Sequence, residues 1–321
     1  MEPPNTAQLD VLIPTYNPQP DHLREALTAL KAQTFADWRC LIHDDASDVD
    51  VRKMVEPYLD DPRFTFERSE RRLGIGRNWN TCFKKTSSPI VAYLFQDDVW
   101  DPMYLQRAVQ ILSKHPDVGF VSMNHTYNIE TSLLGAEEYS ILQQRKRDRL
   151  PAGRNEGRIF LNQWIEDSLW PNLIGEPDFV VIRRNVMDLA GPFNEEMNQV
   201  LDQEYWVRLL LHTNLYYCDE TSGFFRVHAN AATARNRQEG RGLFERFKIL
   251  DDHIKDLSTR TERKAAQKAQ IKQFQLMAEK YRTKRDRGDT ISYKGAGTIK
   301  KFCLRHPIVA AKTLLRTRFR G

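Results

Sequence analysis

The chain has 321 residues, and 40% of them are hydrophobic, so it can bury a core as one large domain or as one domain with an extension. No stretch approaches the about 18 uncharged apolar residues of a membrane-spanning helix, so no transmembrane helix is predicted. Residues 1–8 lack the apolar stretch of a signal peptide. The four cysteines match no zinc or redox spacing, which indicates a reduced, cytoplasmic protein.

The net charge of +5 is unevenly distributed. Residues 241–321 hold 22 Lys and Arg against 8 Asp and Glu, a net charge of +14, which leaves −9 for residues 1–240. This division indicates that catalysis and attachment belong to different parts of the chain. An anionic membrane surface or a nucleic acid could attract the basic part. The alternative is a solvated helical extension without a partner.

The first part of the chain alternates between strand and helix patterns. The expected strands are 9–14, 38–43, 64–66 and 90–95, and the expected helices are 22–33, about 49–59 and about 77–85. Pro14 is expected to end the first strand, because proline has no amide hydrogen for the ladder. Asp21 is expected to cap the first helix. This alternation predicts an α/β sheet built from right-handed crossovers.

The second part is less regular. Residues 101–114 and 202–211 have helical patterns, and 118–123, 179–182 and 224–228 have strand patterns. Between 133 and 155 the hydrophobic pattern gives way to charge. We interpret this stretch as a loop, either mobile beside a site or solvated without a role. Beyond about residue 241 the sequence predicts helices rich in lysine and arginine.

Two adjacent carboxylates, Asp97 and Asp98, follow the apolar stretch 90–95. Ligands of α/β sheets bind at the carboxyl ends of parallel strands. Paired carboxylates in that place suit a hard divalent cation that also holds phosphate oxygens. The alternative is a helix cap or a turn before Pro102.

Six motifs in this order resemble the inverting family 2 glycosyltransferases, which have the nucleotide-diphospho-sugar-binding GT-A fold. They are VLIPTYN at 11–17, QTF at 33–35, HDDAS at 43–47, GIGRN at 74–78, QDDVW at 96–100 and DQEYWVR at 202–208. The resemblance covers about residues 8–235. It implies a mostly parallel central sheet flanked by helices.

The resemblance also implies a domain organisation. We expect a catalytic domain over residues 1–240, with a nucleotide-sugar half at about 8–125 and an acceptor half at about 126–240. Residues 241–321 would form a helical, basic C-terminal extension. Gly175-Glu176-Pro177 resembles the acceptor-side loop of the family.

A nucleotide site is implied at the ends of the first strands. Pro14, Thr15 and Tyr16 would lie beside the base, and Asp45 would contact the base or the ribose. Arg77 resembles the arginine that approaches the nucleotide. The alternatives are helix capping for Asp45 and, for Arg77, a surface arginine at a helix start, where the helix dipole disfavours a cation.

The carboxylate pair resembles the Asp-x-Asp metal motif, usually Asp-x-Asp-Asp, although Phe95 stands at the first position. The resemblance implies Mg²⁺ or Mn²⁺, with Asp98 as the first choice of ligand and Asp97 as the second. His228, in an Arg226-x-His228 pair that matches a late motif of the family, would lie near the metal or the diphosphate. A structural histidine is the alternative.

Inversion by a single displacement needs a base for the acceptor hydroxyl, and the resemblance places Asp202 in that role. Leu201 replaces the acid that usually precedes the base. Glu204 could substitute, but it points to another face of the helix. A helix N-cap is the alternative for Asp202.

The implied reaction moves a sugar from a nucleotide-diphospho-sugar donor to a glycan or lipid-linked saccharide acceptor, in bacterial surface polysaccharide synthesis. Sugar-1-phosphate nucleotidyltransferases have a related fold but usually open with a glycine-rich loop, where this chain has Pro-Thr-Tyr-Asn. A non-catalytic sugar- or nucleic-acid-binding protein is the other alternative, because the acids expected at positions 95 and 201 are missing.

Residues 298–320 mix apolar and basic side chains around Pro307, which predicts two short helices. The apolar members are Ile299, Phe302, Ile308, Val309, Leu314, Leu315 and Phe319. Such helices suit the headgroup region of an anionic membrane, here the cytoplasmic face of the inner membrane. The alternative is packing against the catalytic domain or a second subunit.

Overall fold

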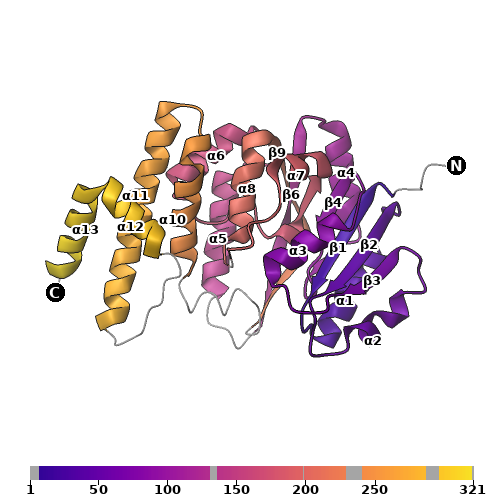
Figure 1. The fold of residues 1–321 in the computed structure, drawn as a ribbon. Coiled ribbons are helices and arrows are strands. Elements are labelled where there is room, and N and C mark those ends of the chain that lie inside the picture. The colour runs from indigo at the N-terminus through magenta and orange to yellow at the C-terminus, as the bar shows by residue number, and fades with distance from the viewer. Residues whose placement is uncertain (1–6, 131–135, 198, 229–240, 287–295, 320–321) are drawn as a thin grey trace. The chain divides into compact units, whose positions relative to one another are not determined.

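The computed structural model describes residues 7–130, 136–197, 199–228, 241–286 and 296–319 (Figure 1). The chain divides into two compact units. Unit 1 comprises Met1–Leu161, Pro171–Met197 and Leu201–Ala229, and unit 2 comprises Asn162–Trp170, Asn198–Val200 and Asn230–Gly321.

Unit 1 opens with four parallel strands and the helices that connect them. The strands are β1 (Leu9–Thr15), β2 (Trp38–Asp44), β3 (Phe64–Arg68) and β4 (Ile90–Tyr93), and they lie in the order β3-β2-β1-β4. The connecting helices are α1 (Pro20–Lys31), α2 (Val51–Val55), which continues as a 3₁₀ helix over Glu56–Tyr58, and α3 (Ile75–Lys84). Every residue of β1 is buried, which is typical of a central strand covered on both faces.

Five further strands continue this sheet beyond β4. They are β5 (Val99–Trp100), β6 (Val118–Ile129), β7 (Gly153–Asn155), β8 (Val180–Arg183) and β9 (Asn214–Val227), and the described sheet runs β3-β2-β1-β4-β8-β6-β9-β5 with β7 on β9. β8 is antiparallel to both β4 and β6, so the sheet is mixed. The helices of this part are α4 (Tyr104–Lys114), α5 (Ala136–Arg149), α6 (Gly157–Glu166), α7 (Arg184–Ala190) and α8 (Leu201–His212). The predicted fold class, a central sheet flanked by helices, is confirmed.

Two predictions about the first elements are wrong in detail. Pro14 lies inside β1, opposite His43 of β2. The even-numbered residues of β1 face β4, as the bond from Leu94 N to Leu12 O (3.0 Å) shows, and the pairing with β4 ends at Leu12. The missing amide hydrogen of Pro14 therefore leaves no strand partner unbonded. Asp21 is not the cap of α1, because Gln19 holds that position and Pro20 begins the helix.

The prediction of a loop between 133 and 155 is also wrong for most of this stretch, because it contains α5 and β7. Residues 131–135 lie outside the described residues. The sequence of α5 has no apolar stripe, so hydrophobic periodicity gave no signal. Its Glu, Gln, Lys, Arg and Leu residues are nevertheless good helix formers. Lys146 is only 7% exposed, so its charged side chain is buried in a stretch that was expected to be a solvent-exposed loop.

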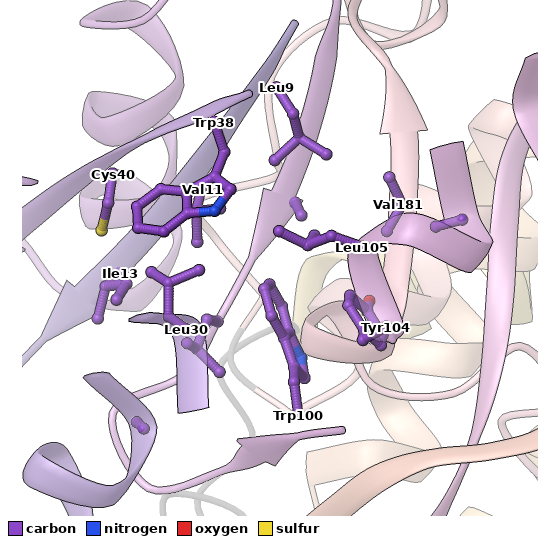
Figure 2. Packing of buried hydrophobic residues seen from close by; sticks show 14 of the residues in the cluster. Leu9, Val11, Ile13, Leu30, Trp38, Cys40, Trp100, Tyr104, Leu105 and Val181 are labelled. Atoms are coloured by element: carbon purple, nitrogen blue, oxygen red, sulfur yellow. The ribbon is translucent and has the colours of Figure 1, made fainter. Parts of the chain in front are cut away.

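The main core of unit 1 lies between the sheet and its helices (Figure 2). Val11 and Ile13 of β1 pack there with Leu30 of α1, and Trp38 of β2 borders them. Trp100 stacks on Tyr104 with 4.2 Å between ring centroids, which carries the core to the segment that follows Asp97 and Asp98. Cys40 of β2 belongs to the same core and is 1% exposed.

Unit 2 has a helical core of its own. Its helices are α10 (Arg241–His253), with a 3₁₀ turn at Ile254–Asp256, α11 (Arg260–Asp286), α12 (Ala296–Arg305) and α13 (Pro307–Phe319). Phe247, Phe274 and Phe302 pack together, with ring centroids 4.9–6.4 Å apart. The predicted division into two short helices at Pro307 is confirmed. No helix within the described ranges is long and apolar enough to cross a membrane.

Candidate active site

The turn after β1 is tied to the segment that carries the paired carboxylates. The amide of Tyr16 donates to Gln96 Oε1 (2.8 Å), and Gln96 Nε2 donates to the carbonyl oxygen of Tyr16 (3.3 Å). Arg72 lies over the Tyr16 ring, 4.1 Å from its centroid. Thr15 is buried, with its hydroxyl 3.4 Å from the carbonyl oxygen of His43. Pro14 and Thr15 are thus buried at the end of β1, and the half-buried Tyr16 begins a structured turn beside Gln96.

The two aspartates at the end of β2, Asp44 and Asp45, have partners within unit 1. Asp44 is fully buried and ion-paired with Arg68. Asp45 accepts hydrogen bonds from the amides of Leu73 (2.6 Å) and Gly74 (2.9 Å). Asp45 therefore holds the segment that leads into α3, and a role in base or ribose contact remains a prediction.

Arg77, in the first turn of α3, forms an ion pair with Glu195 (Nε to Oε2, 2.8 Å). Its side chain is 62% exposed. Asn80 of the same helix also donates to Glu195, at 3.2 Å. The unfavourable position of a cation at a helix start is therefore compensated within the protein, and the approach of Arg77 to a nucleotide stays a prediction.

Asp97 lies next to His228, as Asp97 Oδ2 is 2.8 Å from His228 Nε2. Both side chains are partly exposed, at 22% and 15%. Arg226 fixes the end of β9 that leads to His228. Its Nε donates to the carbonyl oxygen of Asp97 (2.9 Å), and its guanidinium pairs with Glu25 of α1. The late Arg-x-His pair and the carboxylate motif therefore meet in three dimensions.

Close approach of β5 to β9 makes this meeting possible. Gly223 of β9 lies opposite Trp100 of β5. A Cβ atom at Gly223 would lie 2.2 Å from the carbonyl oxygen of Val99, and the φ of +148° also favours glycine. Only glycine lets the two strands pair here, so this position brings the residues after β4 against the end of β9.

Asp98 is buried rather than open to a ligand. It is 1% exposed, and its Oδ1 accepts the amide of Arg226 (2.7 Å). Its Oδ2 and both carboxylate oxygens of Asp178 are buried without a donor among the described residues. Burial raises the pKa of Asp98 well above its usual range, and the charges of Asp178 and Asp97 raise it further. The buried pair therefore retains a proton at a pH where exposed carboxyls have lost theirs.

Asp202 is held from two sides at the start of α8. Asn172 Nδ2 donates to its Oδ2 (2.6 Å), and the amide of Gln203 lies 2.8 Å from its Oδ1. Its side chain keeps intermediate exposure. Glu204 is different, because it is 3% exposed and its carboxylate takes both Nε and Nη2 of Arg208, at 2.8 and 2.7 Å. Glu204 therefore anchors Arg208 and has no open face for a substrate.

The segment around Gly175-Glu176-Pro177, which resembles the acceptor-side loop of the family, links these two regions. The carbonyl oxygens of Ile174, Gly175 and Asp178 each accept two side-chain donors. The donors are, in that order, Ser122 and Lys146, Asn172 and Trp206, and Trp100 and Tyr104. Asp202 is attached to this segment through Asn172, and Asp98 interacts with Asp178 at its other end. Among these donors, only Trp206 and Trp100 lie in recognisable sequence motifs. The other donors could not be identified from the sequence.

The same segment carries Glu176, 3.1 Å from His125 Nε2 (to Oε2) and near Lys146. Burial opposes its ionisation, but the hydrogen bond and charge of His125 and the charge of Lys146 outweigh burial, so the pKa of Glu176 is lowered. Burial lowers the pKa of Lys146 to about 8. These groups form a buried, charged cluster behind the segment.

The donor atoms of Asp97 and His228 fit a divalent cation that is also held by a ligand. Among the described residues, no three His, Cys, Asp or Glu side chains are grouped as a complete metal site. One carboxylate and one imidazole leave coordination positions for diphosphate oxygens and water, as is usual for Mg²⁺ and Mn²⁺ in phosphate sites.

Comparisons with known proteins agree with this architecture. Residues 10–169 match the model of glycosyl transferase family 2. An uncharacterised protein of Mycobacterium tuberculosis, MT1568, is 27% identical over 262 residues, covering 80% of this chain and 79% of that protein. The Escherichia coli UDP-Glc:α-D-GlcNAc-diphosphoundecaprenol β-1,3-glucosyltransferase WfgD is 26% identical over 128 residues. That match covers 40% of this chain and 49% of WfgD, so it spans about half of the named enzyme.

Two solved structures are similar over nearly the whole chain. Staphylococcus aureus TarS 1–349 in complex with UDP-GlcNAc aligns with a TM-score of 0.61 at 14% identity, over 97% of this chain and 79% of TarS. The mannosyltransferase PcManGT of Pyrobaculum calidifontis, with GDP-Man and Mn²⁺, aligns with a TM-score of 0.58 at 16% identity, over 97% and 85%. At these identities the likeness establishes the fold alone. With its GT-A fold and its matching segment 10–169, the chain is a glycosyltransferase that belongs to glycosyl transferase family 2.

Proposed function

We propose that this protein transfers a sugar, with inversion, from a nucleotide-diphospho-sugar to a hydroxyl of a glycan or lipid-linked saccharide in bacterial surface polysaccharide synthesis. The observation that carries the proposal is the meeting of Asp97 and His228 at 2.8 Å, on the same sheet edge as the turn of Tyr16. The names of WfgD and of the UDP-GlcNAc complex of TarS support a nucleotide-sugar donor and a lipid-linked acceptor.

The donor would bind along the ends of β1, β2 and β4. Its base would rest beside Tyr16, which follows Pro14 and Thr15 at the end of β1 and has Arg72 over its ring, and Asp45 would order the segment before α3. Arg77 lies at the start of α3, where exchange of Glu195 for a phosphate would let it face the donor.

Asp97 and His228 would hold Mg²⁺ or Mn²⁺, as the Mn²⁺ complex of PcManGT supports. When bound, the cation neutralises charge on the leaving diphosphate. The geometry favours Asp97 over Asp98 as the direct ligand, which reverses the order expected from the sequence. Asp98 is buried and bonded to Arg226, so we assign it to holding β9 in place.

Asp202 would take the proton of the acceptor hydroxyl, opposite the leaving diphosphate. It combines partial exposure with two donors that fix its orientation, and Glu204 is excluded by its bidentate pair with Arg208. The Gly175–Asp178 segment would form the acceptor side of the site.

A panel of UDP-, GDP- and dTDP-sugars, each assayed for hydrolysis and for a thermal shift with Mn²⁺ and with EDTA, tests the proposal. We expect one donor class to stabilise the protein in Mn²⁺ and to be slowly hydrolysed. A protein that binds a nucleotide sugar but gives no turnover with any acceptor, and is indifferent to Asp202→Asn, would be a non-catalytic binder. An absence of any donor response would refute the proposal.

A further inference from the structure

The apolar residues of α12 and α13 divide between an inner and an outer face. Phe302 and Ala310 are buried in the core of unit 2, and Ile299, Cys303 and Val309 pack against it. Phe302 is fully buried and so does not meet a membrane as expected, while Ile299 and Val309 are partly buried against the same core. The side chains of Leu314, Leu315 and Phe319 lie outside the described residues.

Two large aliphatic side chains remain on the outer face. Leu304, in the last turn of α12, is 73% exposed, and Ile308, in the first turn of α13, is 69% exposed. Leu304 and Lys300 share one face of α12 at i,i+4 spacing, as do Ile308 and Lys312 on α13. Lys300 and Lys312 are exposed, and so is Lys301. We call these five residues the α12–α13 face.

The charge around this face has one sign. Residues 296–321 contain seven Lys and Arg and no Asp or Glu. Arg305 is ion-paired with Asp251 of α10 (2.6 Å), so its charge is partly compensated. The three lysines of the α12–α13 face have no acid on their own helices to compensate them.

We propose that the α12–α13 face docks onto an anionic lipid surface. Leu304 and Ile308 would enter the boundary between headgroups and acyl chains, while Lys300, Lys301 and Lys312 would lie at the level of the lipid phosphates. Helices of 10 and 13 residues are too short to span the bilayer, so the contact is a shallow one.

The same cations would suit a nucleic acid, but the aliphatic side chains favour lipid. A phosphodiester backbone gives branched aliphatic groups no apolar environment, and single-stranded nucleic acids are bound by aromatic stacking. The large hydrophobic side chains described as exposed on α12 and α13 are Leu304 and Ile308, which are both aliphatic. Docking does not depend on the chemistry of the transferase site, and it would bring that site to lipid-linked acceptors.

Co-sedimentation of the full-length protein with vesicles tests this surface. The vesicles are pure phosphatidylcholine or an equal mixture of phosphatidylcholine and phosphatidylglycerol. We expect binding to the anionic vesicles that weakens between roughly 0.1 and 0.5 M NaCl, with little binding to the neutral ones. The double variant Leu304→Gln/Ile308→Gln should lower the partition coefficient about tenfold or more.

The matched control is Leu189→Gln, which removes a leucine of similar exposure (66%) from α7 in unit 1 and should leave binding unchanged. Point variants are preferable to a truncation near Gly297, which would remove Phe302 from the core of unit 2. Unchanged circular dichroism and thermal midpoint verify that each variant is folded.

Three results would overturn the proposal. The wild-type protein could fail to sediment with anionic vesicles, or the Leu304/Ile308 variant could sediment as well as the wild type. The third is a preference for a DNA duplex over anionic vesicles that the double variant retains and Lys300→Gln/Lys301→Gln/Lys312→Gln loses, which would identify a nucleic-acid surface. Donor hydrolysis measured on the same samples reports separately on the proposed function.

Discussion

Asn172 Nδ2 lies 2.6 Å from Asp202 Oδ2, and the two residues are 30 positions apart in the sequence. Asn172 also closes its own turn, since its Oδ1 accepts the amide of Gly175 and its Nδ2 donates to the Gly175 carbonyl oxygen. Trp206, one turn along α8 from Asp202, donates to the same carbonyl oxygen at 3.0 Å. Hydrogen bonds through Asn172 therefore tie the proposed base, Asp202 of α8, to the segment that carries Gly175.

The first prediction concerns Asp202 itself. Asp202→Asn retains the shape of the side chain but cannot accept a proton, so turnover should fall roughly 100-fold or more with little change in donor affinity. Asp188→Asn makes the same change at an exposed position of α7 and should be neutral. Steady-state kinetics with the donor identified in the panel measure both variants. Near-normal turnover in Asp202→Asn would show that another residue is the base.

The second prediction tests Asn172 as a positioning residue. Asn172→Asp places a second carboxylate against Asp202, which raises the pKa of the base because two like charges repel. A base works only when deprotonated, so the acidic limb of kcat should move to higher pH by about one unit.

The control for Asn172 is Asn124→Asp, which removes another side-chain amide bonded to a backbone carbonyl. It should leave the pH profile in place. A loss of activity in Asn172→Asp without any shift of the limb would mean that Asn172 only stabilises the turn.

The third prediction separates Asp97 from Asp98. Asp97→Asn should remove most of the gain in nucleoside-diphosphate affinity that Mn²⁺ confers over EDTA, roughly tenfold or more, because it takes away a charged ligand atom. Asp98→Asn should retain most of that gain, since its carboxylate faces the interior. Calorimetry with UDP and GDP measures both. The reverse pattern would identify Asp98 as the direct ligand. If the wild type binds the nucleoside diphosphate equally well in Mn²⁺ and in EDTA, the metal has no role in binding.

The fourth prediction concerns the buried acid Asp178. Burial raises its pKa well above the usual range, so the folded state binds more protons than the unfolded state above about pH 4. Stability is therefore lost as the pH rises toward the folded-state pKa. Asp178→Asn removes this loss, and its urea midpoint should exceed that of the wild type by more at pH 8 than at pH 5. A difference independent of pH would contradict the assignment.

The fifth prediction uses Lys146, whose pKa burial lowers to about 8. Between this value and the unfolded value near 10.5 the unfolded state binds more protons, so stability rises with pH across that window. From pH 7 to pH 9.5 the wild type should gain about 2 kcal/mol relative to Lys146→Met, which has no titrating group. Urea unfolding of both proteins measures the difference, and parallel curves would show that Lys146 titrates normally.

Local sequence determined much of the framework of unit 1. The buried strand of Leu9–Thr15, the helix with Leu23, Ala26, Leu27 and Leu30 on one face, and the split at Pro307 all follow from periodicity and from proline chemistry. These signals are readable because they depend on neighbours within one element. The motif residues Asp97, Asp202 and His228 are likewise recognisable from the sequence alone.

Tertiary structure alone decided how those residues are used. Asp97 and Asp98 are adjacent in sequence, yet one faces His228 and the other is buried against Arg226 and Asp178, because the chain turns between β4 and β5. Asn172, Lys146 and Gly223 act through partners 30, 28 and 124 residues away, as seen in Asp202, Ile174 and the Val99 carbonyl group. Such contacts form only when the sheet brings distant segments together, so no local sequence pattern predicts them.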